Sequence, residues 1–421
     1  MTALKLVVIA GTLSLLAAGS VALLSRTPAA IRENKPDASA TDPSLGASFT
    51  EQQVKRAGSY RGPGYLAYLF NLILPVVLLL LFARGPFVRL VDRVTSLPGG
   101  WPVHAVVLAV ALTVALALVT LPLGYVRGYA MAHAWGLSTQ DVGGWLSDQL
   151  RGVLVSGVIA AVAAVAYFGA LRWVPDRWWL WGWGSFTVLT ILLTFLFPLL
   201  IAPLFFKFTP LPEGELRTRV LQLASEAGIA LDEVQVADAS RRTTAENAYV
   251  AGIGASKQLV LYDTLLEAGS GDETAFVVAH ELGHKVKNHI WKGIAASSLA
   301  LFAAFAALYW LSHRPELWAW GGAEGPGDLR ALPLLLLFVL AASVITTPLE
   351  SSLSRHHERE ADAAAIELTG DPDTAVRSFR RLAFSNLADL DPPKTIVWLL
   401  FSHPPIPERI EAALAGQPQQ P

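Results

Sequence analysis

Two histidines spaced four residues apart are the residues of this sequence best suited to chemistry. They belong to the pentapeptide His280-Glu-Leu-Gly-His284, inside a run from Asp272 to about Ile290 whose pattern predicts a helix. Positions four apart lie on one helical face, so both imidazoles can reach one point with the Glu281 carboxylate beside them. This arrangement is typical of a zinc site with an adjacent base. Chance and simple solvation are the alternatives, but a His-Glu pair within an apolar run is costly unless something satisfies it.

Such a site needs a third protein ligand. The chain has no cysteine, so the ligand must be His, Asp or Glu. Glu358 and Asp362 lie four apart and share one face of a predicted helix. Glu358 can bind the metal while Asp362 accepts a hydrogen bond from the far nitrogen of a ligand histidine. An exposed helix with surface ion pairs is the alternative reading. Competing donors on the same segment are His356, His357, Glu360 and Glu367.

The composition indicates a membrane protein. Of 421 residues, 53% are hydrophobic and only 16% are charged, where soluble domains usually carry about a quarter. Thirteen tryptophans suit interfacial anchoring. A formal net charge of -2 gives no support to a nucleic-acid partner.

Seven apolar stretches are long enough to cross a bilayer, which takes about 20 residues each. They are Leu4–Leu24, Tyr65–Ala83, Val103–Tyr125, Val153–Leu171, Trp181–Phe205, Ile294–Leu311 and Ala331–Thr347. The first could be a cleaved signal peptide, but its apolar run is long and Ser25-Arg26-Thr27-Pro28 is a poor cleavage site, which favours a retained span.

The spans divide the chain into six parts. We expect a first transmembrane helix at 1–25, a polar linker at 26–63, four spans within 64–206, and two further spans within 293–349. The soluble chemistry then falls into two pieces, 207–292 with the His280 helix and 350–421 with Glu358. Short strands are predicted at Val234–Ala237 and Lys257–Tyr262, and the second piece is predicted to be helical.

Lysine and arginine near the span ends indicate the orientation. Basic residues at 207, 217, 219, 285, 287, 292, 355 and 359 flank the soluble pieces, which places those pieces on the cytoplasmic side of a multi-pass cell-membrane protein. Arg84, Arg89 and Arg93 then fall outside, so the charge pattern is not uniform.

Beyond these patterns, the chain resembles the integral-membrane type I CAAX prenyl protease family of zinc metallopeptidases. The family motif Ser-Arg-x-x-Glu-x-x-Ala-Asp falls on Ser354, Arg355, Glu358, Ala361 and Asp362. Further matching segments are Leu121-Pro122, Gly136–Ser138, Trp145–Asp148, Ile201–Leu211, Asn247–Val250, Val260–Leu265, His280–His284, His403-Pro404 and Arg409-Ile410.

The resemblance implies a fold, a cofactor and a set of roles. The fold is an α-helical polytopic membrane protein of about seven spans around a chamber, with a zincin-like α+β metallopeptidase domain split by the last two spans. It implies one Zn²⁺ per chain, held by His280, His284 and Glu358, with Asp362 in support. Asn247 and His403 would lie beside the metal and steady the peptide or its oxyanion; the alternatives are a turn residue and a helix-start residue.

We therefore expect peptide-bond hydrolysis in which Glu281 is the general base. The partners would be a lipid bilayer and a membrane-associated or C-terminally lipidated peptide or protein. The sequence leaves the oligomeric state open and is compatible with a monomer. A broad quality-control protease is the alternative with the same chemistry. A transporter or a catalytically dead scaffold fits less well, because the charged residues lie in the soluble pieces and neither a ligand nor the base is missing. His289, five residues past His284, is expected on solvated helix surface, and Arg409 in a structural ion pair.

Overall fold

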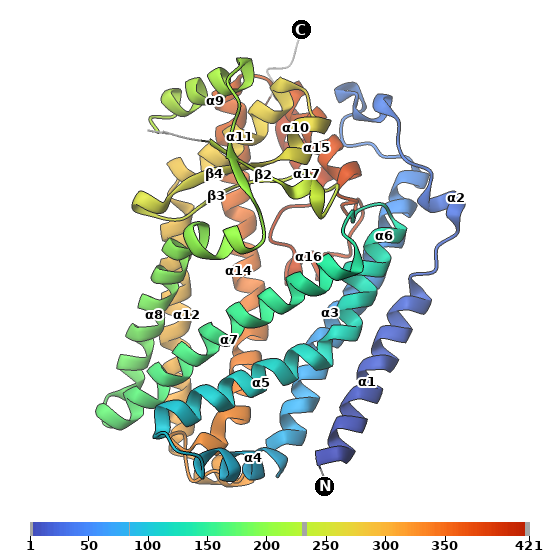
Figure 1. The fold of residues 1–421 in the computed structure, drawn as a ribbon. Coiled ribbons are helices and arrows are strands. Elements are labelled where there is room, and N and C mark those ends of the chain that lie inside the picture. Colours follow the sequence, from blue (N-terminus) through green and yellow to red (C-terminus); the bar gives the residue numbers. More distant parts are fainter. Residues whose placement is uncertain (1–2, 84, 230–233, 417–421) are drawn as a thin grey trace.

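Long helices form one half of the molecule, and a smaller mixed α/β part forms the other. In the computed structural model, which describes residues 3–83, 85–229 and 234–416, the long helices lie below and the sheet with its helices lies above (Figure 1). The described N-terminal end of the chain lies at the end of the helical half farthest from the sheet (Figure 1).

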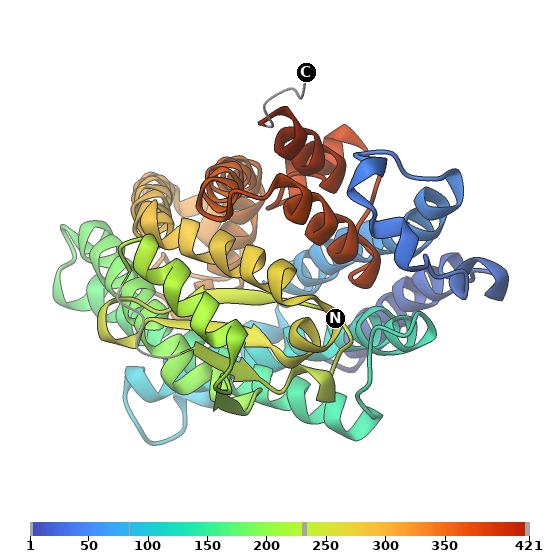
Figure 2. The ribbon, with the colours of Figure 1, turned by 90° about the horizontal axis from the view of Figure 1, so that it is seen from above.

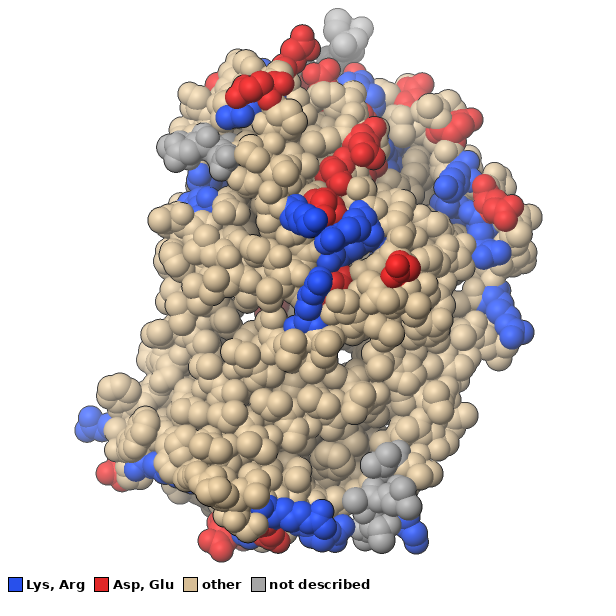
Figure 3. Space-filling view, viewed as in Figure 1, with Lys and Arg blue, Asp and Glu red and all other residues tan. Residues whose placement is uncertain are grey.

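The helical half has the character of a membrane domain. Among the described residues, six helical stretches are long and apolar enough to cross a bilayer, and Val8–Leu24 is a shorter apolar helix. On the face in Figure 3, charged side chains lie over the upper half and at the lower end, and the part of the helical half between them is uncharged. The helices are α1 (Ala3–Leu24), α3 (Glu51–Ala83), α5 (Trp101–Gly124), α7 (Val142–Trp173), α8 (Trp178–Leu196), α12 (His289–Ser312) and α14 (Leu332–Thr369).

These long helices are joined mostly by short segments. Among the described residues these include α4 (Pro86–Thr95) and α13 (Pro315–Trp320), which lie at the end of the membrane domain away from the sheet (Figure 1). The domain's interior is apolar and contains the fully buried side chains of Phe87, Phe168 and Trp318. In a bilayer, close van der Waals packing of such large rings helps to hold the helices together.

The polar segment after α1 is ordered and shorter than the expected 26–63 linker. Helix α3 already begins at Glu51, so residue 63 lies inside it. Before α3, the segment forms α2 (Ala29–Arg32) and two short 3₁₀ turns. The buried guanidinium of Arg380 donates hydrogen bonds to the carbonyls of Ala40, Gly46 and Ser48. Composition predicts a polar linker here, and these contacts with the C-terminal part hold it in place.

A four-stranded sheet supports the catalytic half. Its order is β1 (Phe208–Pro210), β2 (Val234–Ala237), β4 (Gln258–Tyr262), β3 (Ala248–Ala251). Strands β2 and β4 are parallel, whereas β1 and β3 are antiparallel to their neighbours. Because β3 is last in this order, it is an edge strand of the sheet. Helices α9 (Glu215–Glu226) and α11 (Gly271–Val286) pack on it through an apolar core that includes Leu223, Val278 and Leu261.

The C-terminal helices complete the catalytic half. Helix α14 runs without interruption from the membrane domain past the sheet (Figure 1), so the last span and the segment carrying Glu358 are one helix of 38 residues. After it come α15 (Pro372–Ser385), α16 (Lys394–Leu400) and α17 (Ile406–Ala415), seen beside α11 in Figure 2. The sheet and these helices make the α+β domain expected from the sequence, and α12 and α14 divide it.

Candidate active site

Helix α11 carries the histidine pair in a buried and well-capped setting. Ser270 caps its first turn, and the Ser270 and Glu273 side chains bond reciprocally to each other's backbone N–H groups. This capping box fixes where the helix begins. The helix ends near Val286, so His280 and His284 sit in its last two turns, with His280 buried.

Helix α14 approaches α11 unusually closely, and Gly283 allows this approach. A Cβ at residue 283 would lie 3.0 Å from the Ala361 carbonyl oxygen and 3.3 Å from the Ala364 Cβ. The absence of a side chain therefore lets the two backbones meet between the histidines and the acids. This contact brings residues more than 70 positions apart in the chain into one site.

The side chains of three residues converge where the two helices meet. The Nε2 atoms of His280 and His284 lie 3.1 Å apart. Each also lies 3.3 Å from a carboxylate oxygen of Glu358. Glu358 is buried, at 5% exposure. The structure thus brings together the three residues expected to bind a metal.

The chemistry and spacing of these donors fit zinc. Ligand atoms bonded about 2.0–2.1 Å from one tetrahedral ion lie roughly 3.3–3.4 Å from each other, close to the 3.1–3.3 Å found here. Two imidazoles and one carboxylate also leave the fourth position for a water or substrate, as in catalytic rather than structural zinc sites.

Asp362 contacts Nδ1 of His280, the ring nitrogen that does not face Glu358. One of its oxygens lies 2.8 Å from Nδ1 of His280. Arg409 binds the same carboxylate through two nitrogens, at 2.8 and 2.5 Å. Burial alone would lower the pKa of His280, but the hydrogen bonds to Asp362 and Glu358 outweigh burial and raise this pKa to about 10.

Glu281 lies on the cleft side of α11, next to strand β3. Its carboxylate accepts a hydrogen bond from the backbone N–H of Val250 at 3.1 Å. Burial is the main cause of a raised pKa at Glu281, and the Val250 donor acts in the opposite direction. A raised carboxyl pKa moves the group toward the range in which it exchanges protons near neutral pH.

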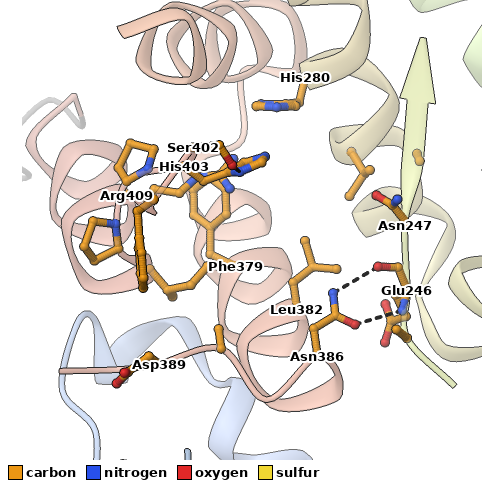
Figure 4. Close-up of a pocket in the computed structure, with 18 of the residues that line it drawn as sticks. Glu246, Asn247, His280, Phe379, Leu382, Asn386, Asp389, Ser402, His403 and Arg409 are labelled. Atoms are coloured by element: carbon orange, nitrogen blue, oxygen red, sulfur yellow. Dashed lines mark hydrogen bonds between the residues drawn. The ribbon is translucent and has the colours of Figure 1, made fainter. Parts of the chain in front are cut away.

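His403 and Asn247 face the same cleft from opposite sides (Figure 4). The cleft has a volume of about 790 Å³ and extends to Arg61 and Tyr65 on α3. His403 follows α16, is 59% exposed, and places Nε2 3.4 Å from Glu358. Asn247 is exposed immediately before β3. Its position is fixed by Asn386, whose side chain bonds both backbone groups of Glu246 (Figure 4).

Two residues beside the site have positions or contacts that the sequence analysis did not predict. Arg355 was known only as part of a motif. It donates to the carbonyls of Val397 and Phe401, and so holds the segment that leads to His403. The expectation that His289 is solvated is wrong, because it is buried and its Nδ1 lies 2.8 Å from Nδ1 of His284. The expected structural pairing of Arg409 is present.

Fold and site together define a membrane-embedded metalloprotease, and comparison with known proteins identifies its family. The profile of Peptidase family M48 matches residues 210–416, and the profile "CAAX prenyl protease N-terminal, five membrane helices" matches residues 34–207. The chain belongs to peptidase family M48, a family of zinc metalloproteases.

Individual relatives agree with this family. The chain is 37% identical over 298 residues to "Uncharacterized metalloprotease YhfN" of Bacillus subtilis, with 70% of each chain covered. It is 31% identical to CAAX prenyl protease 1 of Saccharomyces cerevisiae, covering 70% of this chain and 68% of the relative. The crystal structure of S. mikatae Ste24p has the same fold, with a TM-score of 0.76 at 24% identity, covering 97% of this chain and 99% of that one.

Proposed function

We propose that this chain is a zinc endopeptidase that cleaves peptide bonds of membrane-associated or C-terminally lipidated substrates. The observation that carries the proposal is the convergence of His280, His284 and Glu358 beside Glu281, which lines the cleft together with His280. When bound there, zinc polarises a water molecule and the scissile carbonyl. His280, His284 and Glu358 hold it, and Asp362 orients His280.

Glu281 is the general base in this proposal. Its carboxylate takes a proton from the attacking water and then gives it to the leaving amine. The raised pKa that burial gives Glu281 suits a group that must both accept and release a proton. The Val250 N–H fixes the carboxylate at the edge of the sheet.

Asn247 and His403 serve as donors toward the carbonyl oxygen. Fixed N–H groups placed where negative charge develops stabilise the transition state more than the ground state. Both side chains line the cleft. The hydroxyl of Ser402 lies 2.8 Å from Nδ1 of His403, which leaves Nε2 directed toward Glu358 and the cleft.

The substrate extends along the outer edge of β3. The register with β4 occupies one edge of β3, and the Val250 N–H on the other edge points toward Glu281. An extended peptide that pairs with this free edge would pass beside the general base.

A cavity inside the membrane domain supports a membrane-associated substrate. It has a volume of about 590 Å³ and is lined mostly by apolar side chains of α5, α7, α8, α12 and α14. Such a space accepts an acyl or prenyl chain or an apolar helix segment. The relatives named CAAX prenyl protease favour the lipidated substrate, whereas an apolar helix segment would serve a quality-control protease.

We place the protein in the cell membrane with the catalytic half in the cytoplasm. Lys285, Lys287 and Lys292 gather where α11 meets α12, at the catalytic end of the membrane domain. Basic residues next to spans favour the cytoplasmic side.

Metal analysis combined with peptide cleavage tests the proposal. The purified full-length protein should hold one zinc per chain and cleave a fluorogenic peptide, and a chelator should abolish both properties. Glu281→Gln should keep the zinc and lose cleavage by roughly 10²–10⁴-fold. Full cleavage by this variant, or by the chelated protein, would refute the mechanism. Substrates captured by the same variant would separate a narrow lipidated set from a broad set of membrane proteins.

A further inference from the structure

A line of side chains continues outward from the metal ligand His284. Its Nδ1 lies 2.8 Å from Nδ1 of His289. The other nitrogen of His289, Nε2, lies 3.0 Å from a carboxylate oxygen of Glu360. The side chain of His289 is 5% exposed and that of Glu360 is 30% exposed. The line therefore begins at the metal site and ends at the protein surface.

A break between two helices creates this line. Helix α11 ends at Val286, and Asn288 adopts a left-handed conformation with φ 55° and ψ 36°. Helix α12 then begins at His289 and enters the membrane domain in a new direction. Asparagine accepts left-handed backbone more readily than most residues. The turn brings the imidazole of His289 back against His284, which a continuous helix would not do.

The protons on this line can be assigned from the site itself. Nε2 of His284 faces His280 and Glu358, so it is the atom that would bind the metal. A neutral imidazole bound through Nε2 carries its proton on Nδ1. That proton can be donated only to an unprotonated Nδ1 of His289. The Nε2 atom of His289 then carries a proton and donates it to Glu360.

We propose that His289 and Glu360 are positioning residues that fix the tautomer and ring orientation of His284 for metal binding. The proposal rests on the proposed zinc site but concerns residues outside it. It also makes the two histidine ligands equivalent, because each is supported by a carboxylate. Asp362 supports His280 directly, whereas Glu360 supports His284 through a second imidazole. Loss of such support costs metal affinity, typically by 10–100-fold.

His289 and Glu360, together with His357, could instead form a separate metal site. His289, His357 and Glu360 offer donor atoms within 4.8 Å of one another. Three observations favour the positioning role. The ammonium group of Lys292 lies 3.5 Å from Glu360, where it would repel a cation. The rings of His289 and His357 are stacked at 4.1 Å and 11°, so their in-plane lone pairs do not converge.

The third observation concerns protons. A metal on Nε2 of His289 would place that ring's proton on Nδ1, facing Nδ1 of His284. His284 would then have to carry its own proton on Nε2, the atom that faces His280 and Glu358. The two metals would compete for one tautomeric arrangement.

Zinc affinity of full-length variants tests the proposal without reference to catalysis. Chelator competition in detergent would give the zinc dissociation constant for His289→Phe, which keeps the stacked ring and removes both nitrogens. It would also give the constant for Glu360→Ala, a change at a partly exposed position. Both should bind zinc about 10–100-fold more weakly than the wild type. Glu360→Ala should have no further effect in the His289→Phe background, because both changes interrupt one line.

His357→Phe is the matched control. It keeps the ring stacked on His289 and removes two nitrogens that take no part in the line, so its zinc affinity and its single zinc per chain should match the wild type. Wild-type affinity in both His289→Phe and Glu360→Ala would overturn the proposal. So would two zinc ions in the wild type and one in His357→Phe. A protein that binds zinc as expected but cleaves no peptide would refute the proposed function and leave the positioning role standing.

Discussion

At the scale of single residues, the site depends on pairs in which one side chain holds another in position. Asp362 prepares His280, and Arg409 in turn holds Asp362. Arg355 holds the segment before His403. Because the supporting groups are buried and charged, removal of any one leaves its partner unsatisfied in a region with little water.

Replacement of Glu358 should remove the metal. Glu358→Ala deletes the only carboxylate that contacts both histidine ligands among the described residues, so zinc content should fall well below one per chain. Elemental analysis of the purified protein measures this. Glu367→Ala, a change on an exposed part of the same helix, is the control. Unchanged zinc content in Glu358→Ala would assign the third ligand to another residue.

The backbone donor of Val250 should set the acidic limb of the pH profile. The base must be ionised, so cleavage falls as the pH drops through the raised pKa of Glu281. The Val250 N–H stabilises the carboxylate and lowers that pKa. Val250→Pro removes the donor on the outer edge of β3 and should move the acidic limb to higher pH. The pH dependence of kcat/KM measures this shift.

Val250→Ala is the matched control for that experiment because it shortens the side chain and keeps the N–H. Its acidic limb should coincide with that of the wild type. If Val250→Pro and Val250→Ala give the same limb, the hydrogen bond does not govern the ionisation of Glu281.

At the scale of elements, the close packing of α11 against α14 determines whether the donors meet. Gly283→Val should force the helices apart at Ala361 and Ala364. We expect a loss of about 1–3 kcal/mol in unfolding free energy from overpacking, together with weaker zinc binding. Thermal unfolding and chelator competition measure the two effects.

Gly293→Val makes the same substitution in α12, where a Cβ would meet nothing within 4 Å. It has the same change in helix propensity without the clash, so its zinc affinity should stay at the wild-type value. Equal zinc affinity in both variants would show that the helix contact does not position the ligands.

Sequence patterns predicted some elements well and others poorly, for identifiable reasons. The apolar stretches and the His280–His284 helix have strong periodicity or length, which local physics determines. The order of the segment before α3 depends instead on Arg380, about 340 positions away, which composition cannot reveal. The solvated position predicted for His289 is wrong because the pattern indicates one helix to about Ile290, whereas Asn288 ends that helix. The asparagine before His289 was the available signal.

At the scale of the whole molecule, the membrane domain and the catalytic half are joined by buried charge. Arg242, in the segment before β3, forms two hydrogen bonds with Asp148 of α7, at 2.7 and 3.0 Å. Their side chains are only 13% and 15% exposed. No local sequence pattern predicts this pair, because the two residues lie in different halves of the molecule.

Arg242→Ala should therefore loosen the junction. It leaves the Asp148 carboxylate without its main partner and should lower the unfolding free energy by about 2–4 kcal/mol, seen as a lower Tm in detergent. Arg151→Ala removes a more exposed partner of the same carboxylate and should cost less than about 1 kcal/mol. Equal losses in the two variants would contradict a special role for the junction.

The continuity of α14 also has a consequence for how the protein is made. A nascent chain that has been synthesised only through α12 contains His280 and His284 but not Glu358, because that residue lies in the second half of the last membrane helix. If His280, His284 and Glu358 hold the metal, as proposed, the site can form only after most of the final membrane helix has been synthesised. A partly made copy would then be unable to cut its neighbours.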